Sequence, residues 1–439
     1  MRHLTRLIQL LFAATFLFSG LVKCIDPAGT AIKLTEYLQY FGLGFLSDWA
    51  MGMAWVLCLV EFLSGFNLLL GHLRIVTLII SSLMMVVFTP LTLWLYVSGA
   101  IEDCGCFGDA VRLTNGETFA KNVVLDAMLV WLWVRRRDIY QLLTHTSHTL
   151  YSYWIFALMV WLCWLGTWRE PLIDFRPYVP GTDLRALTVG EERTDDAADA
   201  PDAEGAVTYT CIYRLGNVTR EFPLDSLPDE AEGWEFVETV EHRPDAADTS
   251  SDQTSTSEGE DIDFFVRDVD GNIVTRDLLT YPGYTLLLLS SSLDRASQHD
   301  IDRIEQLSEY CIDQDYPFYC LTARDTIQYN HWLQNTGAEY PFLFTDATIV
   351  QTICRSNPGV MLLRDGVICW KRPLSILDAS ALTSAKLSEQ SSGEIEEIDP
   401  QRRIFFLLIL IFAPFPLFLL LEIPKKYRKT IIKKDSKDA

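Results

Sequence analysis

Basic side chains are scarce in this sequence. It has 36 lysines and arginines against 58 aspartates and glutamates, which leaves a formal net charge of −22 at pH 7. A nucleic-acid-binding protein needs a basic face, so this deficit excludes a nucleic-acid partner. The acidic excess stands beside a hydrophobic fraction of 49%. Because no single globular domain combines the two, apolar segments and acidic tracts must alternate along a chain long enough for two or three domains.

Cysteine is also sparse, with ten residues in 439. Ten thiols spread over this length do not form the dense framework of a small disulfide-stapled domain. Oxidised chemistry at particular cysteines is still permitted. The position of each cysteine therefore matters more than their number.

Long apolar runs are what the sequence does have. Six stretches have the length of about 20 residues that a bilayer requires: 4–22, 50–70, 75–97, 119–135, 151–168 and 404–422. The fourth is the weakest, because it is short and contains Asp126. The first resembles a signal peptide, but no small-residue cleavage site follows Phe18 before Lys23, so we expect a retained helix.

The basic residues predict the orientation of these spans. With six spans they all fall on one face, which must be cytoplasmic: Arg2, Arg6, Arg74, Arg135, Arg136, Arg137 and the lysines and arginine of 425–434. Both termini are then cytoplasmic. The segments 23–49, 98–118 and 169–403 lie on the exported face, and the expected location is a bacterial inner membrane with a large periplasmic domain.

The exported segment divides by composition. Residues 183–206 form an acidic linker and 243–262 a low-complexity linker, because neither tract can bury enough apolar area to order itself. Between them, 207–242 alternates as a small β-rich module. Residues 263–385 alternate strands with helices, which predicts a mixed sheet flanked by helices. A final span at 404–422 leads to a basic tail at 423–439.

This α/β segment resembles a thioredoxin-like domain of the membrane-tethered, thiol-disulfide interchange type. The resemblance is carried by the run from Asn357 and Pro358 to Leu363, followed by the turn at 364–366. It implies that Pro358 is cis and faces the active site. The family's Trp-Cys-x-x-Cys run is missing, since this chain has 290–297 there without a cysteine. The remaining thiols are expected to be small core residues, with Cys354 the best exception: Cys311, Cys320, Cys354 and Cys369.

The loop after the third span carries two thiols one residue apart, Cys104 and Cys106, with glycines at 105 and 108. A disulfide across so tight a ring stores strain, and strained, exposed disulfides are the labile or catalytic ones. The acidic neighbours Glu102, Asp103 and Asp109 would raise the pKa of a nearby thiol, which suits a pair that remains oxidised.

Three interpretations of this loop compete. It is a redox pair, with Cys24 as a candidate resolving thiol, or a structural disulfide, or part of a metal site. Metal ligation is the weakest, because no histidine cluster lies on that face; His145 and His148 belong to a cytoplasmic loop. We therefore predict no metal.

Glu61 lies near the middle of the second span. A carboxylate at that depth is costly and tends to line a cavity, a ligand site or a proton path. The alternative is a protonated glutamate bonded to a neighbouring helix.

Residues 171–178, with Gly181 and Thr182, look like the long Bacteroidetes-type form of the DoxX family. Residues 1–140 resemble the MauE/DoxX family of small bacterial membrane proteins. The resemblance rests on 18–23 with Asp26 and Pro27, on Glu61, and on the Cys-Gly-Cys-Phe-Gly run at 104–108. It implies a four-helix transmembrane bundle, a relation to the quinone-linked vitamin K epoxide reductase group, and work with a thioredoxin-like partner, here fused to the same chain.

The predicted fold is thus an all-α transmembrane bundle joined to an exported α/β thioredoxin-like domain. The leading function is thiol–disulfide exchange at the periplasmic face, with Cys104 and Cys106 as the pair, Cys24 and Glu61 assisting, a quinone as candidate cofactor, and exported proteins as clients. One alternative is a membrane-anchored, non-enzymatic binding module that uses a redox-inactive thioredoxin-like domain. The other is a DoxX-like subunit of a quinone-reducing respiratory complex.

Overall fold

The computed structural model describes residues 1–101, 104–142, 145–187, 208–215, 218–223, 235–242, 264–377 and 386–417. The chain divides into two compact units. One comprises residues 1–185 with 264–439, and the other comprises residues 186–263. Most of the predicted acidic linker, all of the low-complexity linker and the basic tail lie outside the described residues.

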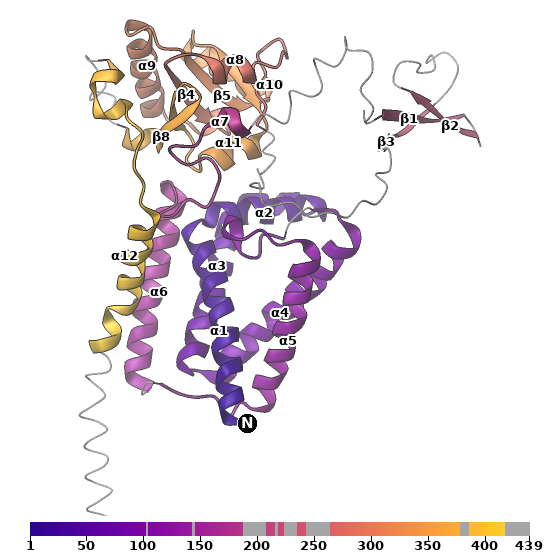
Figure 1. The fold of residues 1–439 in the computed structure, drawn as a ribbon, viewed down its shortest axis with the longest axis vertical. Helices are drawn as coiled ribbons and strands as arrows, with labels where there is room; N and C mark the ends of the chain where they lie inside the picture. The colour runs from indigo at the N-terminus through magenta and orange to yellow at the C-terminus, as the bar shows by residue number, and fades with distance from the viewer. Residues whose placement is uncertain are drawn as a thin grey trace, which may run out of the picture. The chain divides into compact units, whose positions relative to one another are not determined.

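The first unit begins with a helical bundle (Figure 1). Its long helices are α1 (Arg2–Ile25), α3 (Ala50–Leu70), α4 (Arg74–Ser98), α5 (Asn115–Val134) and α6 (His145–Trp168), and α12 (Pro400–Phe412) follows much later in the chain. The described part of the chain holds five helices long and apolar enough to cross a membrane. The protein is therefore a multi-pass membrane protein.

Helix α5 is the exception among the six predicted spans. It forms where the fourth span was expected and packs against α4, but it is too polar to count as a span by composition. Its polar residues include Glu117, Lys121 and Asp126. The Thr89 hydroxyl of α4 donates to the Asp126 carboxylate over 2.8 Å, so this polar residue has a partner inside the bundle.

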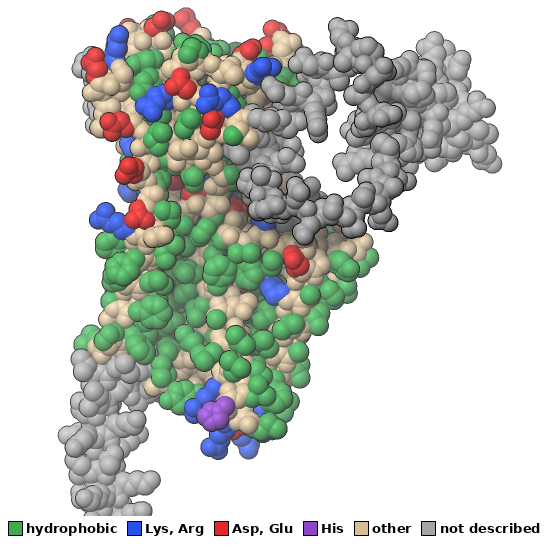
Figure 2. All heavy atoms as spheres, viewed as in Figure 1, with side chains coloured by type: hydrophobic (Ala, Val, Ile, Leu, Met, Phe, Trp, Pro, Cys, Tyr) green, Lys and Arg blue, Asp and Glu red, His purple; other side chains and the backbone are tan. Residues whose placement is uncertain are grey.

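The surface of the helical part is apolar, as a bilayer requires. Figure 2 shows hydrophobic side chains covering the face in view, with Lys, Arg and His side chains gathered at the end near the N-terminus. Fully apolar side chains are widely exposed along these helices, among them Leu7, Leu11, Val56, Leu83, Val86 and Val130. In water such a surface would drive association, whereas in lipid it costs nothing.

Helices α1 and α3 approach each other closely because small residues meet at their contact. A Cβ added at Gly20 would lie 2.5 Å from the backbone nitrogen of Phe62, and one at Gly65 would lie 2.7 Å from the backbone nitrogen of Leu17. Close backbone approach at small residues is the usual basis of helix packing in membranes.

A second helix corrects the expectation of a loop at 23–49. Helix α2 (Pro27–Tyr40) follows α1 after a single residue. Asp26 caps it by accepting the N–H of Gly29 over 3.0 Å, and Pro27 occupies its first position. Both are standard helix-start features that sequence reasoning had not used.

The small second unit contains three strands, β1 (Thr208–Leu215), β2 (Val218–Pro223) and β3 (Glu235–His242). They form an antiparallel sheet in the order β2-β1-β3. These strands fall within the segment 207–242, for which the sequence predicted a small β-rich module.

The α/β domain completes the first unit. Its strands are β4 (Tyr284–Ser290), β5 (Phe318–Ala323), β6 (Phe342–Thr345), β7 (Gly359–Arg364) and β8 (Val367–Pro373), in the order β6-β5-β4-β7-β8. Strands β4, β5 and β6 are parallel, whereas β7 and β8 are antiparallel to their neighbours. The helices are α8 (Thr275–Thr280), α9 (Gln298–Asp313), α10 (Thr326–Thr336) and α11 (Ala347–Ile353).

This domain is thioredoxin-like. The central strand β4 lies between parallel β5 and antiparallel β7, and the peptide bond before Pro358 is cis. Cys311, Cys320 and Cys369 are buried in one hydrophobic cluster, as the sequence predicted for core thiols.

Candidate functional site

The loop that carries the two cysteines connects α4 to α5. Cys104 and Cys106 are both half-buried, and the backbone N–H of Cys106 donates to the Cys104 sulfur over 3.3 Å. Gly105 and Gly108 have φ angles of 61° and 54°, which L side chains rarely adopt. The Gly108 N–H donates to the Gly105 carbonyl over 3.0 Å. The glycines therefore allow a tight turn that holds both thiols on one short segment.

Neighbouring helices fasten this turn. The Ser19 hydroxyl of α1 donates to the Cys106 carbonyl over 2.6 Å. The ring of Phe107 meets Phe18 edge-on, with centroids 5.4 Å apart, and the Lys121 ammonium of α5 lies 4.2 Å from the Phe107 centroid. The loop is thus held by α1 on one side and α5 on the other.

The two thiols differ in acidity. The hydrogen bond with Cys106 lowers the pKa of Cys104 to about 6; the Thr118 hydroxyl and the Lys121 ammonium act in the same direction, against burial. The hydrogen bond with Cys104 and burial hold the pKa of Cys106 well above its usual range. At neutral pH the reduced pair therefore contains one thiolate and one protonated thiol.

The expectation that acidic neighbours raise the thiol pKa is wrong for Cys104. The carboxylate of Asp109 points to Arg355, with 3.0 Å between oxygen and guanidinium nitrogen. Glu102 and Asp103 lie outside the described residues. Hydrogen-bond donors and a lysine around Cys104 stabilise its thiolate.

A cavity of about 90 Å³ links the cysteine loop to the interior of the bundle. Its walls include Cys104, Cys106, Lys23 and Glu61. Most of the remaining surface is apolar, from residues such as Phe16, Leu57, Met85, Phe88, Leu91 and Leu125, and polar residues such as Ser19, Lys33, Tyr37, Lys121 and Asn122 also line it. The Lys23 ammonium and the Glu61 carboxylate lie 2.8 Å apart, and both side chains are buried.

Glu61 thus combines features of both interpretations offered for it. It lines a cavity, and it is bonded to a neighbouring helix. Its partner is a lysine, so the bond is a buried ion pair that joins α3 to α1. Sequence reasoning named Lys23 in a family motif but did not assign it as a partner.

Cys24 is placed apart from the loop thiols. It is fully buried, and it shares one core cluster with Cys58 of α3 and Cys163 of α6. Cys24 is absent from the described residues that line the cavity. No group of three or more His, Cys, Asp or Glu side chains within the described ranges is arranged to hold a metal ion.

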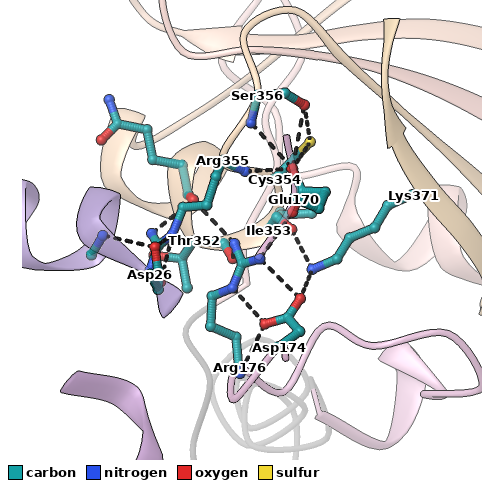
Figure 3. A network of polar contacts seen from close by, with 12 residues as sticks. Asp26, Glu170, Asp174, Arg176, Thr352, Ile353, Cys354, Arg355, Ser356 and Lys371 are labelled. Carbon is teal, nitrogen blue, oxygen red and sulfur yellow. Dashed lines mark hydrogen bonds and ion pairs between the residues drawn. The ribbon is translucent and has the colours of Figure 1, made fainter. Parts of the chain in front are cut away.

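A second polar site joins the thioredoxin-like domain to the bundle (Figure 3). Arg176 is buried and pairs with Asp174 over 2.7 Å and with Glu170 over 2.9 Å. Lys371 of β8 pairs with Asp174 over 2.6 Å. Arg355 pairs with Asp26 over 2.7 Å. Four segments distant in sequence meet in this network.

The network shifts the acidity of its members. Burial raises the pKa of Glu170 and Asp174, but the nearby cations Arg176 and Lys371 outweigh it and hold both pKa values below their usual range. Arg355 does the same for Asp26 against burial. Burial and Arg176 lower the pKa of Lys371. The carboxylates are therefore ionised at neutral pH.

Cys354 belongs to this network and not to the apolar core. Its sulfur lies 3.1 Å from Glu170 Oε1 and 3.0 Å from the Ser356 hydroxyl. Burial and the Glu170 carboxylate raise the pKa of this thiol. A protonated, buried thiol is a poor nucleophile.

Polar side chains without thiols occupy the position of the missing Cys-x-x-Cys run. The Ser290 hydroxyl donates to Asn357 Oδ1 over 2.9 Å, and Asn357 Nδ2 donates to the Ser292 carbonyl over 2.8 Å. The Ser292 hydroxyl donates to Gln328 Oε1 over 3.2 Å. These bonds tie the end of β4 to the residue before Pro358.

Sequence reasoning missed most of the charged residues around the two sites: Lys23, Lys121, Glu170, Asp174, Arg176, Arg355 and Lys371. One signal was available for some of them. Glu170, Asp174 and Arg176 follow α6 within one short segment, and charges so close to a membrane end need partners.

The comparisons with known proteins agree with the helical part of this description. Residues 1–135 match the family described as "Methylamine utilisation protein MauE". These residues therefore resemble the membrane protein of that family, and in this chain they are followed by an α/β domain with thioredoxin-like strand order.

A curated relative covers a similar length. A protein from Flavobacterium psychrophilum described as "Protein TlpB" is 28% identical over 134 residues, which is 30% of this chain and 36% of the relative. The chain thus spans about a third of the length of that relative. No solved structure matches the chain.

Proposed function

We propose that this protein exchanges thiols and disulfides at the exported face of the membrane, with Cys104 and Cys106 as the reacting pair. One observation carries the proposal. Two thiols on a single tight turn have opposite acidities, with the pKa of Cys104 at about 6 and that of Cys106 well above the usual range. An exchange pair needs one thiolate and one protonated partner.

The exchange step follows from this difference. A thiolate of an exported client attacks the Cys106 sulfur of the oxidised pair, and the Cys104–Cys106 bond breaks. Cys104 leaves as the thiolate, because the Cys106 N–H and the Lys121 ammonium still stabilise it when Cys106 is bonded to the client, and the more stabilised thiolate is the better leaving group. A second client thiolate then attacks the client sulfur bound to Cys106, and Cys106 leaves and takes up a proton. The client gains a disulfide, and the pair gains two electrons.

The reduced pair then needs an oxidant, and we propose a membrane quinone. The Cys104 thiolate and the Cys106 thiol would together give up two electrons and one proton and re-form their disulfide, and with a second proton from water this would reduce a quinone to a quinol. The apolar walls of the cavity and its buried Lys23–Glu61 pair suit a ring with polar edges. At about 90 Å³ the cavity is smaller than the roughly 150 Å³ that holds benzene. Entry of a quinone ring therefore requires the lining side chains to move.

The side of the membrane on which we place the chemistry rests on the charge pattern. The basic residues near the N-terminus and in 135–137 favour a cytoplasmic face at the opposite end of the bundle from the cysteine loop. The loop and its clients would then be periplasmic in a bacterial inner membrane.

The test uses the full chain in native membranes. C104S, C106S and the double variant are compared with C320S, which removes a thiol buried in the thioredoxin-like core. Free thiols are trapped by alkylation, and mass spectrometry reports the redox state of exported proteins and of the loop. We expect reduced clients in the three loop variants and oxidised clients in C320S. Client oxidation equal to wild type in the double variant rejects the proposal.

A second candidate function is a membrane-anchored binding module. It is favoured by the bonds among Ser290, Ser292 and Asn357, which replace a reactive pair in the thioredoxin-like domain. A partner that co-purifies equally with wild type and with the C104S/C106S variant, together with unchanged client oxidation, would select this function.

A further inference from the structure

Arg355 connects the thioredoxin-like domain to the cysteine loop. It precedes Pro358 by three residues, and its side chain is only 4% exposed. Its guanidinium donates to both oxygens of Asp26, with the shortest contact 2.7 Å, and to Asp109 over 3.0 Å. Its Nη1 also donates to the Gln351 carbonyl over 2.9 Å. Each of the three guanidinium nitrogens therefore donates at least one hydrogen bond, and Figure 3 shows Arg355 beside Asp26.

The backbone that presents Arg355 is itself fastened. Glu170 Oε1 accepts the N–H groups of Arg355 over 2.9 Å and of Ser356 over 3.2 Å. Glu170 is paired in turn with the buried Arg176. The arginine therefore projects from a fixed loop, and it is not a freely moving surface residue.

Its two carboxylate partners are fixed on the side of the bundle. Asp26 caps α2 through the N–H of Gly29. Asp109 lies in the short helix η2 (Gly108–Ala110), three residues after Cys106. The turn bond from Gly108 to Gly105 lies between them, so a force on Asp109 reaches the thiols through one tight turn.

The positive charge of Arg355 compensates the two carboxylates beside it, Asp26 and Asp109. Burial raises the pKa of Asp109, Arg355 lowers it, and the neighbouring Asp26 carboxylate raises it. Without the guanidinium, the largely buried Asp26 carboxylate and the partly exposed Asp109 carboxylate would remain close together with one cation fewer. Such an arrangement is strongly unfavourable, and it is relieved when the loop moves away or Asp109 takes up a proton.

We propose that Arg355 is a positioning residue that holds the Cys104–Cys106 loop against the thioredoxin-like domain. A domain without a reactive thiol pair would then still control the reactivity of the pair in the bundle. This inference rests on the proposed function for its biological meaning. Its physical content, the link between Arg355 and thiol reactivity, is testable without any client.

The experiment measures alkylation of Cys104 by iodoacetamide against pH, in native membranes with peptide-level mass spectrometry. Among the described residues, the charged groups near the pair are Lys23, Lys33, Asp109, Arg112 and Lys121. At high pH, where Cys104 is fully ionised, the limiting rate reports how accessible the loop is. At lower pH the midpoint reports its electrostatic surroundings.

We expect R355Q to raise the limiting rate several-fold, because the loop is released. D109N removes the same anchor and keeps the arginine, so it should raise the limiting rate similarly. The R355Q/D109N double variant should not exceed either single variant, since both act through one contact. R355K retains the charge and loses the forked contacts, so it should lie between R355Q and wild type.

R303Q is the matched control. Arg303 is an arginine of the same domain that donates to the Leu374 and Ser375 carbonyls. It should leave Cys104 alkylation unchanged. Wild-type limiting rates in both R355Q and D109N overturn the inference, and D109N decides it if R355Q does not accumulate. Altered rates with unchanged client oxidation in C104S/C106S would uphold the inference and reject the proposed function.

Discussion

Two cysteines on either side of the Arg355 contact have pKa values that are shifted in opposite directions. Cys104 lies in the bundle's loop, where hydrogen bonding with Cys106 lowers its pKa to about 6. Cys354 lies in the thioredoxin-like domain, four residues before Pro358, where burial and the Glu170 carboxylate raise its pKa. The immediate donors and charges set the reactivity of a thiol, whereas membership of a thioredoxin-like fold does not.

The thiol pair and the thioredoxin-like fold lie in different regions of this chain. The fold that commonly carries a reactive pair has serines and an asparagine in that position, joined by hydrogen bonds. The loop in the membrane region carries the pair instead. The network of Figure 3 brings the two regions into contact. The thioredoxin-like domain has no reactive thiol pair of its own, and it contributes Arg355, which pairs with Asp109 of the cysteine loop.

The largest expected effect concerns the ion pair beneath the cysteine loop. K23M or E61Q leaves a buried charge without its partner, which should cost about 3–5 kcal/mol of stability. The K23M/E61Q double variant should recover much of this loss. Unfolding in detergent by denaturant measures the loss, and E36Q, which weakens the partly exposed pair with Lys33, should change little. Equal stability of E61Q and wild type would mean that Lys23 does not need its partner.

The pH dependence of alkylation sharpens the comparison of the two thiols. Cys104 should react at pH 7 and lose reactivity as the pH falls through about 6, because its thiolate becomes protonated there. Cys354 should react at least about a hundredfold more slowly at pH 7, since its raised pKa leaves little thiolate. C106S should move the Cys104 midpoint upward, because it removes the thiol that lowers it most. Equal rates at Cys104 and Cys354 would end the comparison.

The turn itself gives a smaller effect. G105A and G108A force a side chain into a positive φ, at a cost of roughly 1–2 kcal/mol each. Stability in detergent and the Cys104 alkylation rate should both change. Gly52, a helical glycine of α3 with open space around it, is the control, and G52A should be neutral or slightly stabilising. If G105A behaves like G52A, the turn is not strained as described.

The smallest effect is expected in the thioredoxin-like domain. S292A removes one hydrogen bond to Gln328, which should cost about 0.5–1.5 kcal/mol. Client oxidation and Cys104 alkylation should be unchanged, because no thiol is involved. Loss of client oxidation in S292A at normal protein levels would show that this face takes part in the chemistry.

The parts of the fold that depend on neighbours in sequence were predictable. Apolar runs of membrane length, alternation in the strands, and the resemblance around Pro358 predicted the bundle, the mixed sheet and the missing thiol pair. The loop with Cys104 and Cys106 was recognised from its glycines. Helix α2 was missed because its residues are only moderately apolar, although Asp26 and Pro27 signalled its start. Helix α5 was expected as a span, but with three charged residues it is not among the helices of the described residues that are apolar enough to cross a membrane.

What the sequence by itself determined is therefore the list of elements and the presence of a thiol pair in a glycine-bounded loop between two of them. The tertiary structure decided the chemistry of that pair. The acidic residues beside the cysteines predicted thiols with a raised pKa. Folding instead brought Lys121 to Cys104 and turned Asp109 toward Arg355. Asp26 and Arg355 are 329 positions apart, yet they form one ion pair. Electrostatic interactions depend on distance in space, and that distance is set only when the chain has packed.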